Sequence, residues 1–170
     1  CENLSSGCVT DDTPRFSFTV KSDRPGASLR RARLSVGNWE TETRSRIGIP
    51  YTGEPLLPFC DYTAKLEAED DAGERAGAEL VFSTGRLDTP WKGKWITEGS
   101  YRFTQKRTSP VPLTFRRAFA CGKKVRSAKI YATALGIYEL EINGEKVGKD
   151  YFAPGFTSYK HHLQYQVYDV

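Results

Sequence analysis

The chain has 170 residues, of which 38% are hydrophobic and 27% are charged, and these proportions are ordinary for a soluble globular protein. Its length allows one medium-sized domain or two small ones, with hydrophobic cores that need no metal or disulfide. No apolar run approaches the roughly 20 residues of a transmembrane helix, so we expect no membrane span. No signal peptide is visible, and because the chain opens on Cys1 rather than Met, we expect its natural start to lie upstream.

The two halves of the chain differ in charge. Residues 1–85 contain 10 Lys and Arg against 14 Asp and Glu, whereas residues 86–170 contain 15 against 7. Two units with different surfaces are the simplest explanation. The basic second half raises nucleic-acid binding as a rival function, but its cations alternate with apolar residues along expected strands, without an RNP-like or helix-turn-helix pattern. We therefore expect a solvated sheet face and no nucleic-acid partner.

Short alternating stretches dominate the sequence and helical periodicity is almost absent, which predicts an all-β protein. The clearest pattern runs from Leu56 to Ala68, where every second residue is apolar or small, and the intervening residues Thr63, Lys65 and Glu67 are polar. One face of this strand is expected to pack against the core and the other to be exposed to solvent. Further strands are expected at residues 15–20, 32–36, 47–51 and 78–85. Several strands in the first half predict a small β-sandwich.

The first half also contains a predicted strand that ends at Tyr51 and a run of acidic residues. The stretch 47–51 is expected to direct Ile47, Ile49 and Tyr51 to one face of a strand. The acidic run at residues 67–74, like a shorter one at 139–141, is interpreted as solvated strand faces and a turn rather than as a catalytic carboxylate pair.

Residues 86–100 are interpreted as a connector that contains two tryptophans, and residues 101–170 as a second unit. Alternation predicts strands at residues 113–119 and 128–132. The stretch from Tyr138 to Gly148 then carries an Asn-Gly pair between two short alternating segments.

This Asn-Gly pair predicts a β-hairpin. A two-residue loop of this kind requires positive φ at both positions, which Asn143 and Gly144 tolerate, and gives a type I′ turn. The register then places an apolar pair on one face and an opposite-charge pair on the other, namely Leu140 with Val147 and Glu141 with Lys146, while Ile142 faces Glu145. We interpret the stretch as sheet-building rather than as a site.

The cysteines show neither CxxC spacing nor clustered histidines, so no zinc site is expected. Cys1 and Cys8 could pair in an oxidising compartment. Cys60 and Cys121 are expected to be buried, since free cysteine is among the most buried residue types.

The segments "DDTPRFSF", "YTGEPLLPFCDYTAKLEAEDDAG", "WKGKWI", "AKIYATALGIYELEINGEKVG" and "APGFTSYKHHLQYQVYDV" occur in the order seen in bacterial α-L-rhamnosidases, which the chain resembles over nearly its whole length. Those enzymes consist of a fibronectin-III-like β-sandwich, a jelly-roll-like β-sandwich, further β modules and an (α/α)6 catalytic barrel. The resemblance implies a fibronectin-III-like sandwich at residues 1–85, with Tyr62 in its tyrosine-corner position. It also implies the first strands of a jelly-roll, sugar-binding-like domain at residues 101–170, truncated at Val170.

In this family the acid and base carboxylates belong to the helical barrel, so the resemblance gives no residue of this chain a catalytic role. It implies the non-catalytic amino-terminal part of a secreted or periplasmic bacterial glycoside hydrolase that removes terminal α-L-rhamnose with inversion. The expected partners are rhamnosylated glycans and the catalytic barrel of the same chain. Two alternatives stay open: a free-standing carbohydrate-binding or adhesion module, and the accessory domains of a β-galactosidase-type glycosidase.

Carbohydrate binding by the second unit is the local function that the sequence favours, because sugars are held by aromatic side chains with a few polar groups that fix their orientation. The candidate residues are Trp91, Asn143, Asp150, Tyr151, Tyr159 and His161, with Phe156 as a further available aromatic side chain. No cofactor is expected. Some relatives bind sugar through calcium in this type of module, but no acidic cluster here is dense enough to name a calcium site.

Overall fold

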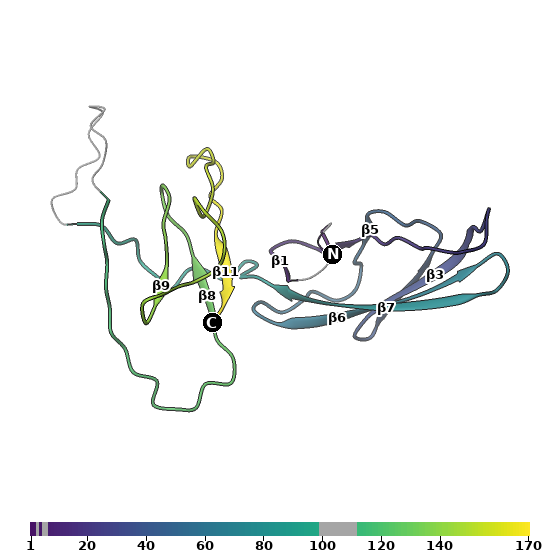
Figure 1. Cartoon of the computed structure of the whole chain (residues 1–170), viewed down its shortest axis with the longest axis horizontal. Helices are drawn as coiled ribbons and strands as arrows, with labels where there is room; N and C mark the ends of the chain where they lie inside the picture. The colour runs from purple at the N-terminus through teal and green to yellow at the C-terminus, as the bar shows by residue number, and fades with distance from the viewer. Residues whose placement is uncertain (3, 5–6, 99–111) are drawn as a thin grey trace. The chain divides into compact units, whose positions relative to one another are not determined.

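The computed structural model describes residues 1–2, 4, 7–98 and 112–170, and every regular element among them is a β-strand (Figure 1). The chain divides into two compact units, Cys1–Pro90 and Trp91–Val170. The strands of the first unit are β1 (Cys8–Thr10), β2 (Arg15–Phe16), β3 (Leu29–Val36), β4 (Trp39–Thr43), β5 (Ile49–Pro50), β6 (Asp61–Asp70) and β7 (Arg75–Thr84). Those of the second are β8 (Lys129–Ala132), β9 (Glu141–Ile142), β10 (Glu145–Lys146) and β11 (Gln166–Asp169).

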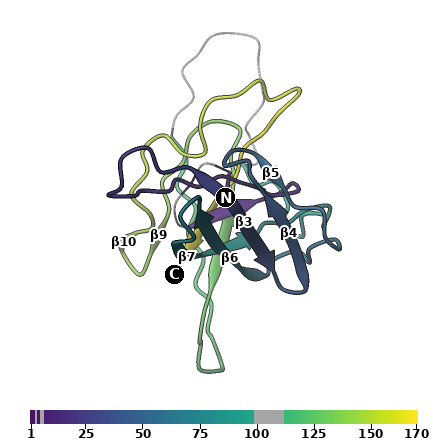
Figure 2. The same cartoon turned by 90° about the vertical axis from the view of Figure 1, so that its right-hand side faces the viewer.

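The first unit is a two-layer β-sandwich. One layer is a five-stranded sheet in the order β1-β7-β6-β3-β4, and the other is the pair β2 and β5 (Figure 2). All neighbours in the large sheet are antiparallel except β1 and β7, which run parallel. The expected all-β fold with an amino-terminal sandwich is therefore confirmed.

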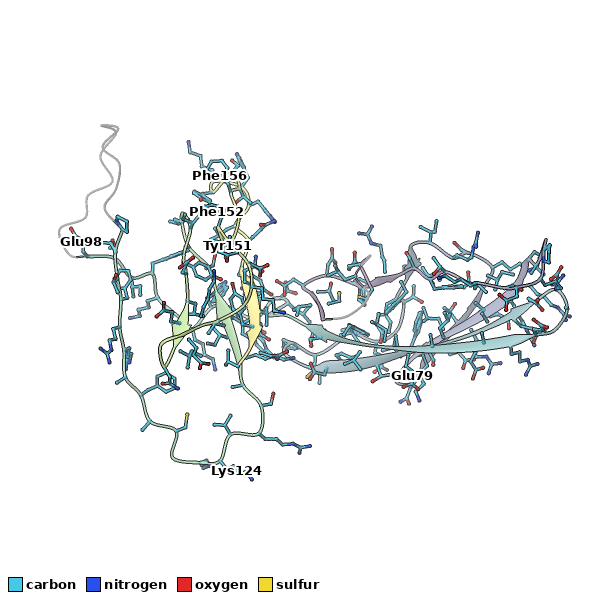
Figure 3. The ribbon with its side chains drawn as sticks, viewed as in Figure 1. Glu79, Glu98, Lys124, Tyr151, Phe152 and Phe156 are labelled. Atoms are coloured by element: carbon cyan, nitrogen blue, oxygen red, sulfur yellow. The ribbon has the colours of Figure 1, made fainter. Side chains whose placement is uncertain are left out.

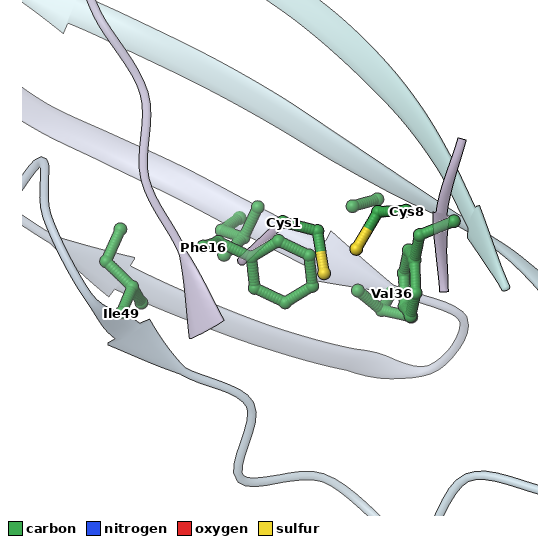
Figure 4. Close-up of a cluster of buried hydrophobic side chains, with 8 residues drawn as sticks. Cys1, Cys8, Phe16, Val36 and Ile49 are labelled. Atoms are coloured by element: carbon green, nitrogen blue, oxygen red, sulfur yellow. The ribbon is translucent and has the colours of Figure 1, made fainter. Parts of the chain in front are cut away.

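The core of this unit is built by the alternation seen in the sequence. In β3, Ala32, Leu34 and Val36 are buried while the residues between them are not. Leu34 and Val36 join a cluster with Phe16 and Ile49 from the opposite layer (Figure 4). Cys1 and Cys8, the two amino-terminal cysteines, belong to the same cluster as free thiols.

Tyr62 holds the corner of the sandwich, as the family resemblance implied. It lies on β6, the penultimate strand of the unit, and its hydroxyl oxygen accepts a hydrogen bond of 2.8 Å from the Leu57 N–H. A tyrosine hydroxyl bonded to backbone a few residues upstream is the tyrosine corner of such sandwiches. Beside it, the fully buried Thr84 hydroxyl donates to the Leu57 carbonyl (2.6 Å) and accepts from the Cys60 N–H (3.0 Å).

The expected strand at residues 47–51 is shorter in the structure. Ile49 is buried on β5, but Ile47 is 80% exposed. Gly48 between them adopts a φ of 64°, and this left-handed residue turns the chain so that the two isoleucines no longer share a face. The segment after Phe16 is irregular too, although Phe18 still packs on the core and donates its N–H to the Arg46 carbonyl.

The second unit confirms the strand near residues 128–132 and the hairpin but not the strand at 113–119. Strand β8 pairs with β11, and β9 pairs with β10. Residues 112–128 contain no strand, and Phe115 and Phe119 are exposed. Cys121 in this segment is exposed rather than buried, and Cys60 of the first unit is half-buried. Alternation cannot bury a strand unless another element covers it, and no element among the described residues pairs with this segment.

Residues 99–111 include the end of the expected connector and the start of the expected second domain, and these parts of the prediction lie outside the described residues. Within the described part of the chain, no helix is long and apolar enough to cross a membrane.

Candidate functional site

The hairpin adopts the register that the sequence predicted. Ile142 pairs with Glu145 and Glu141 with Lys146, and the Val147 N–H donates to the Leu140 carbonyl at 2.8 Å. The turn residues Asn143 and Gly144 have φ values of 54° and 86°, both in the left-handed region that a type I′ turn requires. The hairpin therefore has the pairing and the turn type that its sequence predicts.

The base of the hairpin is anchored by two tyrosines. The hydroxyls of Tyr138 and Tyr168 lie 3.1 Å apart and share a hydrogen bond. Burial, together with this hydrogen bond, raises the pKa of Tyr138 well above its ordinary value. Gly148 lies against the Tyr168 ring so closely that a Cβ atom there would come within 2.4 Å of Cε1. This contact fixes where the chain leaves the hairpin.

The loop after the hairpin is anchored at its middle. Ala153 and Pro154, joined by a cis peptide bond, are buried. The Ala153 carbonyl accepts the Tyr138 N–H at 2.8 Å, and the Pro154 carbonyl accepts the Gln166 side-chain amide at 3.3 Å. The chain is therefore fixed at Ala153 and Pro154, while Phe152 and Phe156 on either side of them have side chains exposed to solvent.

Those outer side chains are aromatic. Tyr151, Phe152 and Phe156 have exposed fractions of 75%, 73% and 92%, and Figure 3 shows the three at the same end of the second unit. Tyr159 contacts Phe156, with ring centroids 5.8 Å apart. We call these four residues the aromatic surface. Exposed groups of large aromatic side chains are typical of interaction sites, which makes this surface the candidate site of the second unit.

A cation lies at the edge of the aromatic surface. The Lys146 ammonium is 3.9 Å from the centroid of the Tyr151 ring, within cation–π range. The same ammonium lies 3.4 Å from Glu139 Oε1, on the face of the hairpin that also carries Glu141. Lys146 therefore places a hydrogen-bond donor beside the Tyr151 ring.

The predicted site residues are only partly brought together. Tyr151 and Tyr159 belong to the aromatic surface. Asn143 is exposed in the hairpin turn, and Asp150 is exposed just before Tyr151. His161 is exposed in a turn where its N–H and that of His162 both bond to the Ser158 carbonyl. Trp91 packs elsewhere, edge-on against Tyr165 with centroids 5.5 Å apart.

One residue of the aromatic surface, Phe152, and the cation at its edge, Lys146, were not predicted as site residues. Phe152 directly follows Tyr151, and its exposure depends on the burial of Ala153 and Pro154 beside it. No sequence pattern predicts that burial. Lys146 was identified only as a strand residue facing Glu141. The predicted hairpin register could have identified Lys146, because the register determines on which face of the hairpin its side chain lies.

The acidic run of the first unit is not simply a solvated face. The Glu69 side chain is only 9% exposed and is surrounded by arginines, with Arg31 at 2.9 Å, Arg75 at 3.0 Å and Arg30 at 3.2 Å. The hydrogen bond from Arg31 is the main cause that lowers the pKa of Glu69. The interpretation as a wet strand face is therefore wrong for Glu69, which is an internal ion-pair centre.

Two neighbouring carboxylates are held in the same way. Arg24 bonds to both Asp70 and Asp71 and lowers the pKa of each. Among the described residues, no group of three or more His, Cys, Asp or Glu is placed to hold a metal ion.

Comparison with known proteins connects both units to one family. A family model described as the Rha78A-like, N-terminal immunoglobulin domain matches residues 1–88, and one described as the alpha-L-rhamnosidase N-terminal domain matches residues 123–170. An α-L-rhamnosidase of Formosa agariphila is 30% identical in a 142-residue alignment that covers 78% of this chain and 15% of the relative. An α-L-rhamnosidase of Streptomyces avermitilis is 58% identical over 48 residues, which are 28% of this chain and 5% of the relative.

A solved structure extends this likeness to the fold. The α-L-rhamnosidase from Dictyoglumus thermophilum matches with a TM-score of 0.84 at 27% identity, over 99% of this chain and 22% of that one. The chain therefore spans less than a quarter of the length of these relatives.

Proposed function

The chain belongs to the Rha78A-like family of α-L-rhamnosidase amino-terminal regions, and from this we propose that it is the non-catalytic, carbohydrate-recognising part of an α-L-rhamnosidase. The whole protein would hydrolyse terminal α-L-rhamnose with inversion. Inverting hydrolysis uses an acid and a base carboxylate about 6.5–9.5 Å apart, and we assign both to an (α/α)6 barrel of the same protein. The domains described here would brace that barrel and present its glycan.

The aromatic surface is the observation that carries the recognition role. Sugar rings present apolar C–H faces, and rhamnose adds a methyl group, so they fit exposed aromatic side chains with a few polar groups beside them. Tyr151, Phe152 and Phe156 supply the aromatic side chains. Lys146 and Asp150 supply the polar groups next to them.

The state of the carboxylates supports the non-catalytic role. A general acid must hold its proton near neutral pH, which requires a raised pKa. The pKa values of Glu69, Asp70 and Asp71 are lowered by arginines, so these groups are kept as carboxylates and suit ion pairing instead.

A titration of the 170-residue chain with methyl α-L-rhamnoside, followed by nuclear magnetic resonance, tests the recognition role. The sugar should shift the signals of Tyr151 and Phe156, and Tyr151→Ala should weaken binding about tenfold through loss of one stacked face. Phe119→Ala is the matched control, because it removes an equally exposed ring (78% exposed) outside the aromatic surface. Unchanged binding in Tyr151→Ala would count against the assignment.

The non-catalytic role has its own test. The chain should release no rhamnose from an aryl α-L-rhamnoside, and release that disappears with a substitution in this chain would contradict it. Two further statements stay predictions. One is the set of domain limits, with units at 1–85 and 101–170 and a connector at 86–100, and the second is a secreted or periplasmic location. Fractionating the natural host and locating the protein there would check the second.

A further inference from the structure

Strand β7 leaves most of one edge without a neighbour. It lies between β6 and β1, but β1 pairs only with residues Phe82–Thr84 (Figure 1). From Arg75 to Val81, β7 is paired on the β6 side alone among the residues that the structure describes. An edge of this kind presents a row of backbone N–H and C=O groups to which another strand can bind.

The backbone groups facing this edge belong to alternate residues. In an antiparallel pair, residues that bond to the neighbour alternate with residues whose groups point away from it. The Asp70 N–H donates to the Glu74 carbonyl at 3.0 Å, so even-numbered residues bond toward β6. The Gly85 N–H donates to the Thr10 carbonyl at 2.8 Å, so odd-numbered residues face the β1 side. The open edge is therefore lined by the backbone groups of Arg75, Gly77, Glu79 and Val81.

The sequence along this edge is complementary to itself. If a second copy is placed antiparallel about a two-fold axis at Gly77, each Arg75 lies opposite the other copy's Glu79, and each Ala76 lies opposite Ala78. A shift by two residues would place Arg75 opposite Val81 or Gly77 and remove both charge pairs. Since opposite charges across a strand pair stabilise its register and like charges oppose it, we infer that two copies of this chain associate through the open edge of β7.

The side chains at the edge permit close approach. Ala76, Gly77 and Ala78 are small and exposed. Arg75 and Glu79 already have partners in their own chain, Glu69 at 3.0 Å and Lys65 at 3.0 Å, but their side chains are 74% and 62% exposed. The guanidinium has five donors and the carboxylate has two oxygens, so each has capacity for a second contact. Figure 3 shows Glu79 on the outer side of the sheet, where such a contact would form.

Sedimentation equilibrium of the full chain over a concentration series tests the inference. A short edge buries less than the ~1,000 Å² of stable complexes, so we expect a weak dimer with a dissociation constant on the order of 0.1–1 mM. Arg75→Glu and Glu79→Arg should each weaken this dimer about tenfold, because the charges then repel across the axis. An equimolar mixture of these two variants should dimerise again, because each substituted chain then meets the opposite charge.

Further variants separate this edge from any other contact. Glu40→Arg makes the same charge change at β4, on the far edge of the same sheet, and should leave dimerisation unchanged. Gly77→Pro removes an N–H at the open edge without removing a bond to β6, and should abolish the dimer while the circular dichroism spectrum stays the same. Three outcomes would each overturn the inference: a wild-type chain that stays monomeric, a mixture of Arg75→Glu and Glu79→Arg that dimerises no more than either variant alone, or a dimer that Gly77→Pro does not weaken.

Discussion

Glu69 is the residue whose surroundings differ most from its place in the sequence pattern. Strand alternation directs it to the outer face, yet three arginines from β3 and β7 cover it. A carboxylate so enclosed is stable only while its cations remain, and those cations would repel one another without it. This one side chain therefore links three neighbouring strands of the sheet.

Replacing Glu69 by Gln keeps the shape of the side chain and removes its charge. We expect the unfolding temperature of the first unit to fall by at least several degrees, because Arg30, Arg31 and Arg75 would lose the carboxylate that they share. Glu67→Gln is the control, since Glu67 lies two residues away on the same strand and is exposed. Differential scanning calorimetry would measure the unfolding temperature of both variants, and an equal decrease in the two would contradict the role of Glu69.

The same network should make stability depend on pH. Because the pKa of Glu69 is lower in the folded state than its ordinary value of 4.5, its contribution is complete above that value and is lost as the pH falls through the folded pKa. The difference in unfolding temperature between wild type and Glu69→Gln should therefore be largest near pH 6 and shrink at pH values below about 4.

At the scale of elements, the sequence predicted those strands whose pattern is local. The alternation of β3 and β6 and the Asn143-Gly144 turn contain their own register, so the pairing could be worked out without tertiary contacts. The stretch 113–119 alternates equally well but forms no strand. Alternation states only which face would be buried, whereas a strand also needs a neighbour to bond with.

A substitution at Gly148 would test the contact that attaches the hairpin to the rest of the second unit. Its φ is 78°, and an added Cβ would collide with the Tyr168 ring. Gly148→Ala should therefore destabilise the second unit by about 2 kcal/mol and disturb the hydrogen bond between the Tyr138 and Tyr168 hydroxyls. Gly122→Ala is a suitable control because nothing lies within 4 Å of the added atom. Chemical denaturation followed by tyrosine fluorescence would compare the two variants.

At the scale of the whole molecule, the candidate site could be predicted only in part. Residue type and position after the hairpin were enough to nominate Tyr151 and Tyr159. The separation of Trp91 from them was not accessible, because it depends on the packing of Trp91 against Tyr165. Phe152 was missed because its exposure follows from the buried turn beside it rather than from its own neighbours in sequence.

The strandless segment of the second unit predicts where proteases act first. Residues 112–128 have no strand and are exposed except at position 128, whereas the basic residues of β3 and β6 lie in a paired sheet. Trypsin should therefore cleave at Arg116, Arg117, Lys123 or Lys124 before it cleaves at Arg33 or Lys65. Mass spectrometry of early digests would identify the order of cleavage, and early cleavage within β3 would contradict it.

The parallel pairing of β1 with β7 has a mechanical consequence. The first and last strands of the first unit lie side by side and run in the same direction. Tension applied between Gly7 and Gly85 would pull these strands past each other along their length, loading the hydrogen bonds between them together rather than one after another. The first unit should therefore resist stretching between these two points of its chain.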